Sequence, residues 1–278
     1  MSGSASVETR SGKDRSDENF PVGSALISAR LRPHVHALYR FARNADDIAD
    51  SPALAAGDKV ARLEVMEDVL LGRRQEGSPS AAGLRASLAQ CGVTAQHGCD
   101  LLVAFKRDAV KPRTQDWADL LDYCRYSAMP VGRHMLDLHG ESRETWPASD
   151  ALCAVLQVLN HLQDCGKDLA GLDRCYLPED LMASRGTGVD DLRRPAVTAG
   201  MRGVIDSLLD RCDILNATAA GLPGQTRDRR LRLEIAVITG LARRLAGRLR
   251  AGDPLATRVK LTRTDAIGAV LAAMRFLP

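Results

Sequence analysis

Aromatic residues and long apolar runs are scarce in this sequence. Its 278 residues include four Phe, four Tyr and two Trp, so that aromatics make up 4% of the chain. A core for this length must be built mainly from aliphatic residues, and the abundant Ala and Leu favour helices. No apolar run approaches the roughly 18 residues that cross a bilayer. These absences predict an all-α protein without a transmembrane helix.

Charge of one sign and paired cysteines are lacking as well. Lys and Arg number 38 and Asp and Glu 35, which leaves a net charge of +3. So small an excess predicts no nucleic-acid partner. The seven cysteines contain no CxxC pair, and residues 1–19 hold no apolar segment of the kind that directs secretion. We therefore expect free thiols and a cytoplasmic protein.

The organisation along the chain is a series of helical patterns. Residues 1–18 are rich in Ser, Gly and charge and predict a disordered leader. Helical patterns then cover residues 33–50, 57–72, 80–90, 93–109, 115–139, 149–170, 178–184, 195–220, 226–251 and 262–276. Neither a strand pattern nor a Gly/Ser linker interrupts them, so we expect one all-α domain over residues 19–278.

Proline and capping residues bound some of these helices. Pro33 suits a first helical turn, and Pro52 ends the same helix just before it. Ser149 and Asp150 are capping residues for a helix that starts there. Pro130 lies inside a helical pattern and marks either a helix boundary or a kink.

The first helix carries a polar stripe. Asp46 and Asp50 are four residues apart and share a helix face. Tyr39 and Arg43 extend that face backward, and Asp47 lies beside it. A second stripe repeats the spacing 118 residues later: Gln157, His161, Asp164 and Asp168, flanked by Asn160 and Lys167.

Two solvated helix faces are the plain interpretation of these stripes. Two features argue against it: like charges four residues apart destabilise a helix, and the second helix is too apolar elsewhere to be exposed. If the stripes face each other, five carboxylates converge and repel one another. Mg²⁺ prefers oxygen ligands completed by substrate phosphates, so these aspartates are candidate magnesium ligands. Arg43, Lys167 and Arg174 are candidates for binding phosphate oxygens, and the implied chemistry is metal-assisted loss of a diphosphate.

Three segments, in order over about residues 17–180, resemble motifs of the squalene/phytoene synthase family. Residues 39–50 (YRFARNADDIAD) are similar to its first aspartate-rich motif. Residues 157–168 (QVLNHLQDCGKD), followed by 173–178 (DRCYLP), are similar to its second motif. Residues 123–128 (YCRYSA) resemble its Tyr-Cys segment.

The resemblance implies an isoprenoid synthase helical bundle around a central cavity, acting on prenyl diphosphates. It implies that Asp46, Asp50, Asp164 and Asp168 bind diphosphate through more than one Mg²⁺ ion, and that Tyr123 lies near the reacting centre. Residues that would support the diphosphate or the substrate are Tyr39, Arg43, Gln157, Asn160, Lys167 and Arg174. Tyr176 serves either phosphate contact or structure.

Departures from the common family pattern point to a subgroup. Residues 19–22 (NFPV), 130–133 (PVGR) and 161–164 (HLQD) resemble the bacterial hopanoid-pathway proteins. There, one paralogue makes presqualene diphosphate, and another converts it to hydroxysqualene by capturing water. The segments look like the second paralogue, which implies a carbon–oxygen lyase that needs no NADPH and is supplied by a presqualene diphosphate synthase. Asn19 and Phe20 are then expected to contact the substrate.

Alternatives stay open at several points. The alternative activity is that of a head-to-head prenyl transferase, which makes squalene, dehydrosqualene or phytoene from farnesyl or geranylgeranyl diphosphate. A non-catalytic scaffold is the third hypothesis, but both aspartate stripes are complete. Phe41 either stabilises a cation, as Phe20 and Tyr123 could, or packs in the core. His161 is either a structural helix histidine or a base.

An arginine-rich stretch remains, at residues 227–250. It is either a solvated amphipathic helix or a peripheral contact with the inner face of an anionic membrane.

Overall fold

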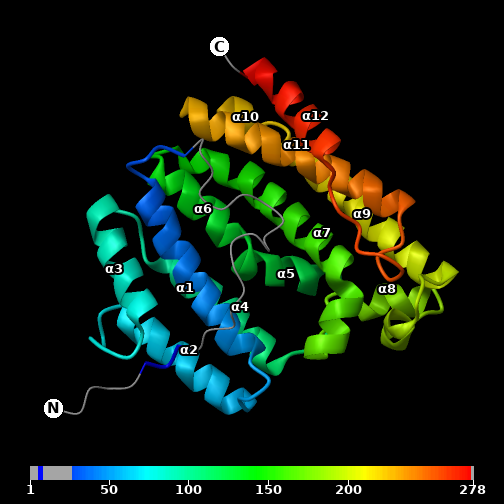
Figure 1. Cartoon of the computed structure of the whole chain (residues 1–278), viewed down its shortest axis with the longest axis horizontal. Helices are drawn as coiled ribbons and strands as arrows, with labels where there is room; N and C mark the ends of the chain where they lie inside the picture. Colours follow the sequence, from blue (N-terminus) through cyan, green and yellow to red (C-terminus); the bar gives the residue numbers. More distant parts are fainter. Residues whose placement is uncertain (1–5, 9–26, 277–278) are drawn as a thin grey trace. The chain divides into compact units, whose positions relative to one another are not determined.

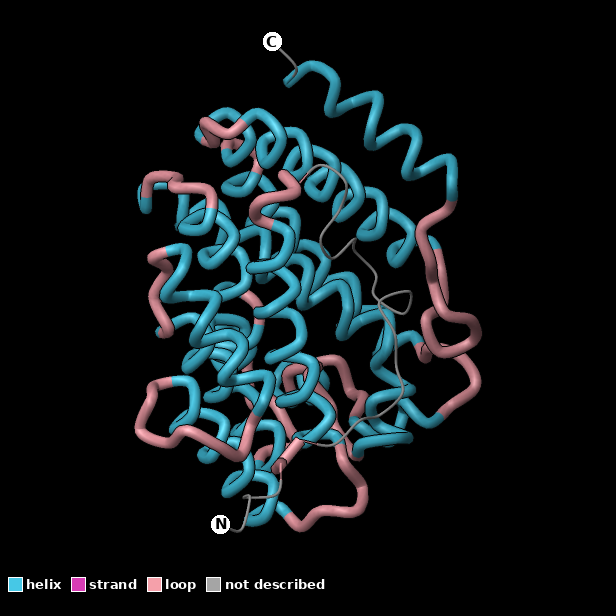
Figure 2. The backbone as a smooth tube through the Cα atoms, turned by 60° about the vertical axis from the view of Figure 1, so that its left-hand side comes forward, coloured by secondary structure: helices cyan, strands magenta, loops and turns pink. Residues whose placement is uncertain are grey.

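The computed structural model describes residues 6–8 and 27–276 (Figure 1). Asn19, Phe20 and most of the expected leader lie outside the described residues. Within the described ranges all regular structure is helical, apart from one isolated bridge between Arg113 and Cys175 (Figure 2). The predicted all-α class is thereby confirmed.

The chain divides into two compact units, each considered separately below. The first comprises residues 1–111 and 133–140, and the second comprises residues 112–132 and 141–278. The expected single domain over residues 19–278 stays a prediction.

The first unit is built from α1 to α4 and most of α6. Its helices are α1 (Arg32–Asp50), α2 (Ala56–Leu70), α3 (Pro79–Cys91), α4 (Gln96–Val110) and α6 (Met129–Leu138). Helix α1 packs against α3 and α4, and α2 packs against the same two helices. Phe41 and Ile48 are fully buried in this core together with Leu63, which leaves the opposite side of α1 to its polar stripe. Phe41 therefore packs in the core, as one of its two interpretations expected.

The second unit is organised around the 27-residue helix α7 (Trp146–Leu172). Its other helices are α5 (Trp117–Ser127), α8 (Glu179–Ser184), α9 (Ala199–Ala219), α10 (Leu222–Gln225), α11 (Arg229–Ala251) and α12 (Arg263–Ala273), with short 3-10 turns η2 (Arg143–Thr145), η3 (Val189–Arg193) and η4 (Met274–Phe276). Helix α7 packs against α5, α9 and α11, and α12 packs on α11 (Figure 1). Leu152, Leu159 and Leu162 bury the apolar side of α7.

Most predicted helix bounds lie within three residues of the observed ones, but the expected helix over residues 195–220 starts only at Ala199, and two other differences have a clear physical cause. The expected helix over residues 115–139 is divided at Ala128, so that Pro130 lies in the first turn of α6, where a missing N–H costs nothing. Helix α7 starts at Trp146 rather than at 149, because Pro147 occupies its first turn and η2 leads directly into it. The expected capping role of Ser149 and Asp150 was therefore wrong, and Ser149 is buried inside the helix.

The state of the cysteines and the hydropathy of the helices were both addressed by the sequence. All seven cysteines are free thiols. No helix in the described part of the chain is both long enough and apolar enough to cross a bilayer.

Candidate active site

The stripe on α1 combines carboxylates with one arginine. Arg43 contacts Asp46 (Nη1 to Oδ2, 3.0 Å) and Asp47 (Nη2 to Oδ1, 2.8 Å). The side chain of Asp46 is 33% exposed, whereas that of Asp47 is 7% exposed. Arg43 therefore offsets the repulsion within the stripe, and Asp46 is the more accessible of the two carboxylates. Tyr39 and Asp50 are partly buried on the same helix.

The stripe on α7 is similarly placed at the boundary of a buried helix face. Gln157, Asp164 and Asp168 are partly buried, and so is the neighbouring Asn160. Lys167 is exposed. The side-chain nitrogens of Gln157 and His161 (Nε2 to Nε2) lie 3.1 Å apart, at hydrogen-bond distance.

Three rings from separate elements meet beside this stripe. The ring of His161 stacks on that of Tyr176, with centroids 3.8 Å apart and planes 20° apart. Tyr123, from α5, lies 5.1 Å from Tyr176 and 5.7 Å from His161, centroid to centroid. Burial lowers the pKa of His161 to about 3, so its imidazole is neutral at physiological pH. Neutrality lets Nε2 accept the amide N–H of Gln157 and disfavours a cationic role for this histidine.

The segment after α7 is held in place by a second loop. Asp173 ends α7 in the left-handed region, at φ 51°, which turns the chain sharply. Arg113 donates to the backbone oxygen of Asp173 and contacts its carboxylate at 2.9 Å, while Cys175 N donates to Pro112 O at 2.9 Å. These contacts fix the backbone on both sides of Arg174, which is only 6% exposed, and set Tyr176 against His161.

Arg258 is absent from the residues that the motifs predict, yet it contacts the second stripe directly. Its Nε lies 3.0 Å from Asp164 Oδ1, and its Nη2 lies 3.0 Å from Asp164 Oδ2. One residue further back on α7, Gln163 Nε2 donates to Val259 O at 2.6 Å. The segment between α11 and α12 is therefore fastened to α7 beside the aspartates. A basic cluster at Arg258, Lys260 and Arg263 is the signal that could have drawn attention to it.

The donor set suits a hard cation. Each stripe presents two carboxylates at i and i+4, and carboxylate oxygens are the ligands that Mg²⁺ prefers. Among the described residues no three His, Cys, Asp or Glu side chains are gathered as a ready metal cluster. Magnesium binding by Asp46, Asp47, Asp50, Asp164 and Asp168 stays a prediction.

The helical fold is that of the all-α isoprenoid synthases. A solved squalene synthase from Alicyclobacillus acidocaldarius matches it with a TM-score of 0.74 and 33% identity, over 85% of this chain and 90% of that one. The chain belongs to the squalene/phytoene synthase family, whose model matches residues 13–265. It is therefore an isoprenoid synthase.

Two curated relatives are similar to this chain over almost its whole length. The hydroxysqualene synthase of Rhodopseudomonas palustris is 46% identical over 267 residues, which cover 96% of this chain and 91% of the relative. The hydroxysqualene synthase of Zymomonas mobilis is 44% identical, over 95% of this chain and 89% of the relative.

Proposed function

We propose that this chain is a hydroxysqualene-forming lyase that acts on presqualene diphosphate. The observation that carries the proposal is the 46% identity, across nearly the whole chain, to a relative named hydroxysqualene synthase. Both aspartate stripes of this chain are complete, as a diphosphate-releasing enzyme requires.

The proposed reaction balances without a redox partner. The carbon–oxygen bond to the diphosphate breaks, and its electron pair leaves with the diphosphate. The cyclopropylcarbinyl cation that remains rearranges and opens. Water then forms a new carbon–oxygen bond and releases one proton, which gives hydroxysqualene and diphosphate. No electrons are gained or lost overall, so NADPH is not required.

The residues of the two stripes would bind the diphosphate end of the substrate. Mg²⁺ held by Asp46, Asp50, Asp164 and Asp168 would stabilise the negative charge of the departing diphosphate. Arg43 is already fixed against the first stripe and is 19% exposed, so its guanidinium can bind phosphate oxygens without a large loss of side-chain entropy. Arg174 and Lys167 are the corresponding candidates beside the second stripe.

The ring cluster would serve the hydrocarbon end. Tyr123 and Tyr176 supply aromatic faces, which attract a cation, and the buried imidazole of His161 is neutral. A protonated histidine at this place would repel a carbocation. The low pKa of His161 therefore supports a role in shaping the site rather than in transferring protons.

A head-to-head prenyl transferase is the second candidate. The observation that favours it is the name squalene synthase on the Alicyclobacillus structure, at 33% identity. The two candidates differ in their substrate, because the transferase condenses farnesyl or geranylgeranyl diphosphate, whereas the lyase needs presqualene diphosphate from a synthase paralogue.

Product analysis with the two substrates side by side separates the candidates. Purified protein with Mg²⁺ and presqualene diphosphate, without NADPH, is expected to yield hydroxysqualene, and farnesyl diphosphate alone is expected to be recovered unchanged. Presqualene diphosphate, squalene or dehydrosqualene formed from farnesyl diphosphate would instead favour the transferase. Asp168→Asn is the matched inactive control.

A further inference from the structure

Helix α12 and the turn η4 expose a continuous apolar stripe. Four of the nine exposed large apolar side chains among the described residues lie here: Ile267 (59% exposed), Val270 (49%), Leu271 (62%) and Met274 (51%). Their spacing of i, i+3, i+4 and i+7 places them on one side of the helix. The remaining five are Leu71, Val103, Val110, Val131 and Ile214; Val103 and Val110 share α4, and no other element gathers more than one.

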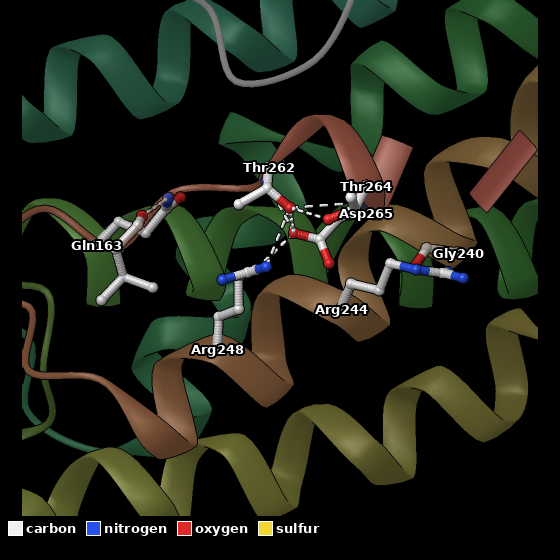
Figure 3. Close-up of polar contacts among 8 residues, drawn as sticks. Gln163, Gly240, Arg244, Arg248, Thr262, Thr264 and Asp265 are labelled. Carbon is white, nitrogen blue, oxygen red and sulfur yellow. Dashed lines mark hydrogen bonds and ion pairs between the residues drawn. The ribbon is translucent and has the colours of Figure 1, made fainter. Parts of the chain in front are cut away.

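The opposite side of α12 is fixed to α11. Ala269 and Ala273 are buried, and a Cβ added at Gly240 of α11 would meet the Cβ of Ala269 at 3.3 Å, so the two helices approach closely. At the start of α12, Thr262 caps the helix and Arg248 binds Asp265 (Figure 3). The exposed stripe is therefore part of a packed helix with a defined orientation, not a frayed end of the chain.

Four of the seven arginines of α11 contact other groups within the protein: Arg232, Arg244, Arg248 and Arg250. Arg248 binds Asp265, and Arg250 binds Asp210 and Asp213. Arg244 donates to the backbone oxygen of Gly240 on its own helix (Figure 3). Arg229, Arg230 and Arg243 are exposed, so α11 also presents basic groups to solvent, whereas the exposed apolar stripe lies on α12 and η4.

Arginines stand at both ends of the stripe. Arg263 is exposed one helical turn before Ile267, and Arg275 is exposed directly after Met274. The one acid of α12, Asp265, is occupied by Arg248. An apolar face with basic residues at its margins is the pattern of helices that lie in the interface of an anionic bilayer, where the arginines reach lipid phosphates.

We propose that the stripe formed by Ile267, Val270, Leu271 and Met274 docks this protein on an anionic lipid bilayer. The charges favour a bilayer over a second copy of the chain. A twofold dimer through this face would bring the arginines at its margins close to those of the other copy, with no free acid on α12 to balance them. A surface of anionic headgroups balances them directly, and the acyl region accepts the apolar side chains.

Sedimentation with lipid vesicles tests the proposal without any substrate, so its result is independent of the activity proposed above. Wild-type protein is expected to partition at least tenfold more strongly to vesicles containing phosphatidylglycerol than to pure phosphatidylcholine, and to be released by added salt. The double variant Ile267→Gln/Leu271→Gln, which keeps good helix formers, is expected to lose at least tenfold in partitioning. Arg263→Gln/Arg275→Gln should lose the preference for phosphatidylglycerol.

A matched control variant, and a measurement of whether the protein is a monomer or a dimer in solution, complete the test. Ile214→Gln removes a similarly exposed apolar side chain from α9 and should bind vesicles as the wild type does. Thermal unfolding of each variant checks that it folds, and the charge variant keeps the test decisive if the apolar one does not. Absence of wild-type binding, or equal binding by all variants, would overturn the proposal. So would a wild-type dimer that becomes monomeric in Ile267→Gln/Leu271→Gln, since that would identify a second copy as the occupant.

Discussion

Mild acid should destabilise this protein through two buried histidines. His134 on α6 is 1% exposed, and burial lowers its pKa to about 4. His161 on α7 is 4% exposed, and burial lowers its pKa to about 3. Neither ring nitrogen of His134 has a hydrogen-bond partner among the described residues, and the charge of nearby Asp137 offsets the cost of burial only in part.

The sign follows from the direction of the two pKa shifts. An unfolded chain binds protons at its histidines near pH 6.5, whereas the folded chain leaves these two imidazoles neutral to much lower pH. The unfolded state therefore binds more protons below about pH 6.5, and stability falls as the pH falls. Between about pH 7 and about pH 5.5, each histidine removes about 1.2 kcal/mol of unfolding free energy, and the pair removes about 2.5 kcal/mol. Because both folded pKa values lie well below 5.5, the result depends little on where they lie.

Urea denaturation at the two pH values measures this loss. Glutamine does not titrate, so His134→Gln and His161→Gln should each halve the difference between the two pH values, to about 1.2 kcal/mol. The double variant should lose that difference almost entirely, apart from contributions of other groups shared with the wild type. Full retention of the wild-type pH dependence in both single variants would refute the assignment of buried, neutral imidazoles.

Further predictions concern the stripes, the helix packing and the segment before α12. Asp46→Asn and Asp168→Asn should each abolish turnover while leaving the protein folded, with thermal unfolding little changed, because Asp46→Asn removes both repulsion from Asp50 and the ion pair with Arg43; unchanged turnover in both would reject the site. Gly132→Ala should destabilise by about 1–2 kcal/mol in urea denaturation, since the new Cβ would lie 2.5 Å from Ser149 Oγ and 2.6 Å from Cys153 Sγ. Gly247→Ala, on α11 with no atom within 4 Å, should instead stabilise by up to about 1 kcal/mol, and the same sign for both variants would contradict the packing described. Arg258→Gln should speed amide hydrogen exchange over residues 253–262, because the contact with Asp164 no longer fastens this segment to α7. It should also tighten Mg²⁺ binding measured by calorimetry, because Asp164 no longer has to release a guanidinium. Unchanged exchange would show that the contact does not fasten the segment.

Local patterns in the sequence predict the helices and the two stripes well. The stripe from Tyr39 to Asp50 depends only on residues within one helix, so its spacing determines which side chains share a face. The start of α7 was missed because Ser149 and Asp150 are good capping residues, while Pro147 in the first turn is the signal that prevails.

Contacts between distant segments could not be read from the same patterns. Arg258 and Asp164 are 94 residues apart, and their pairing depends on how the segment after α11 returns to α7. The stack of Tyr176 on His161 likewise depends on residues 112–115, which hold the segment after α7 through backbone hydrogen bonds. The low pKa of His161 follows from its burial in the folded chain, so a helix pattern alone gives no indication of it.

The origin of the product oxygen is the most direct test of the proposed function. Protein, Mg²⁺ and presqualene diphosphate are incubated in ¹⁸O-labelled water without NADPH, and the extracted alcohol is analysed by mass spectrometry. The proposed lyase predicts hydroxysqualene carrying one ¹⁸O atom. An alcohol without the label, or a hydrocarbon as the main product, would contradict capture of the cation by water.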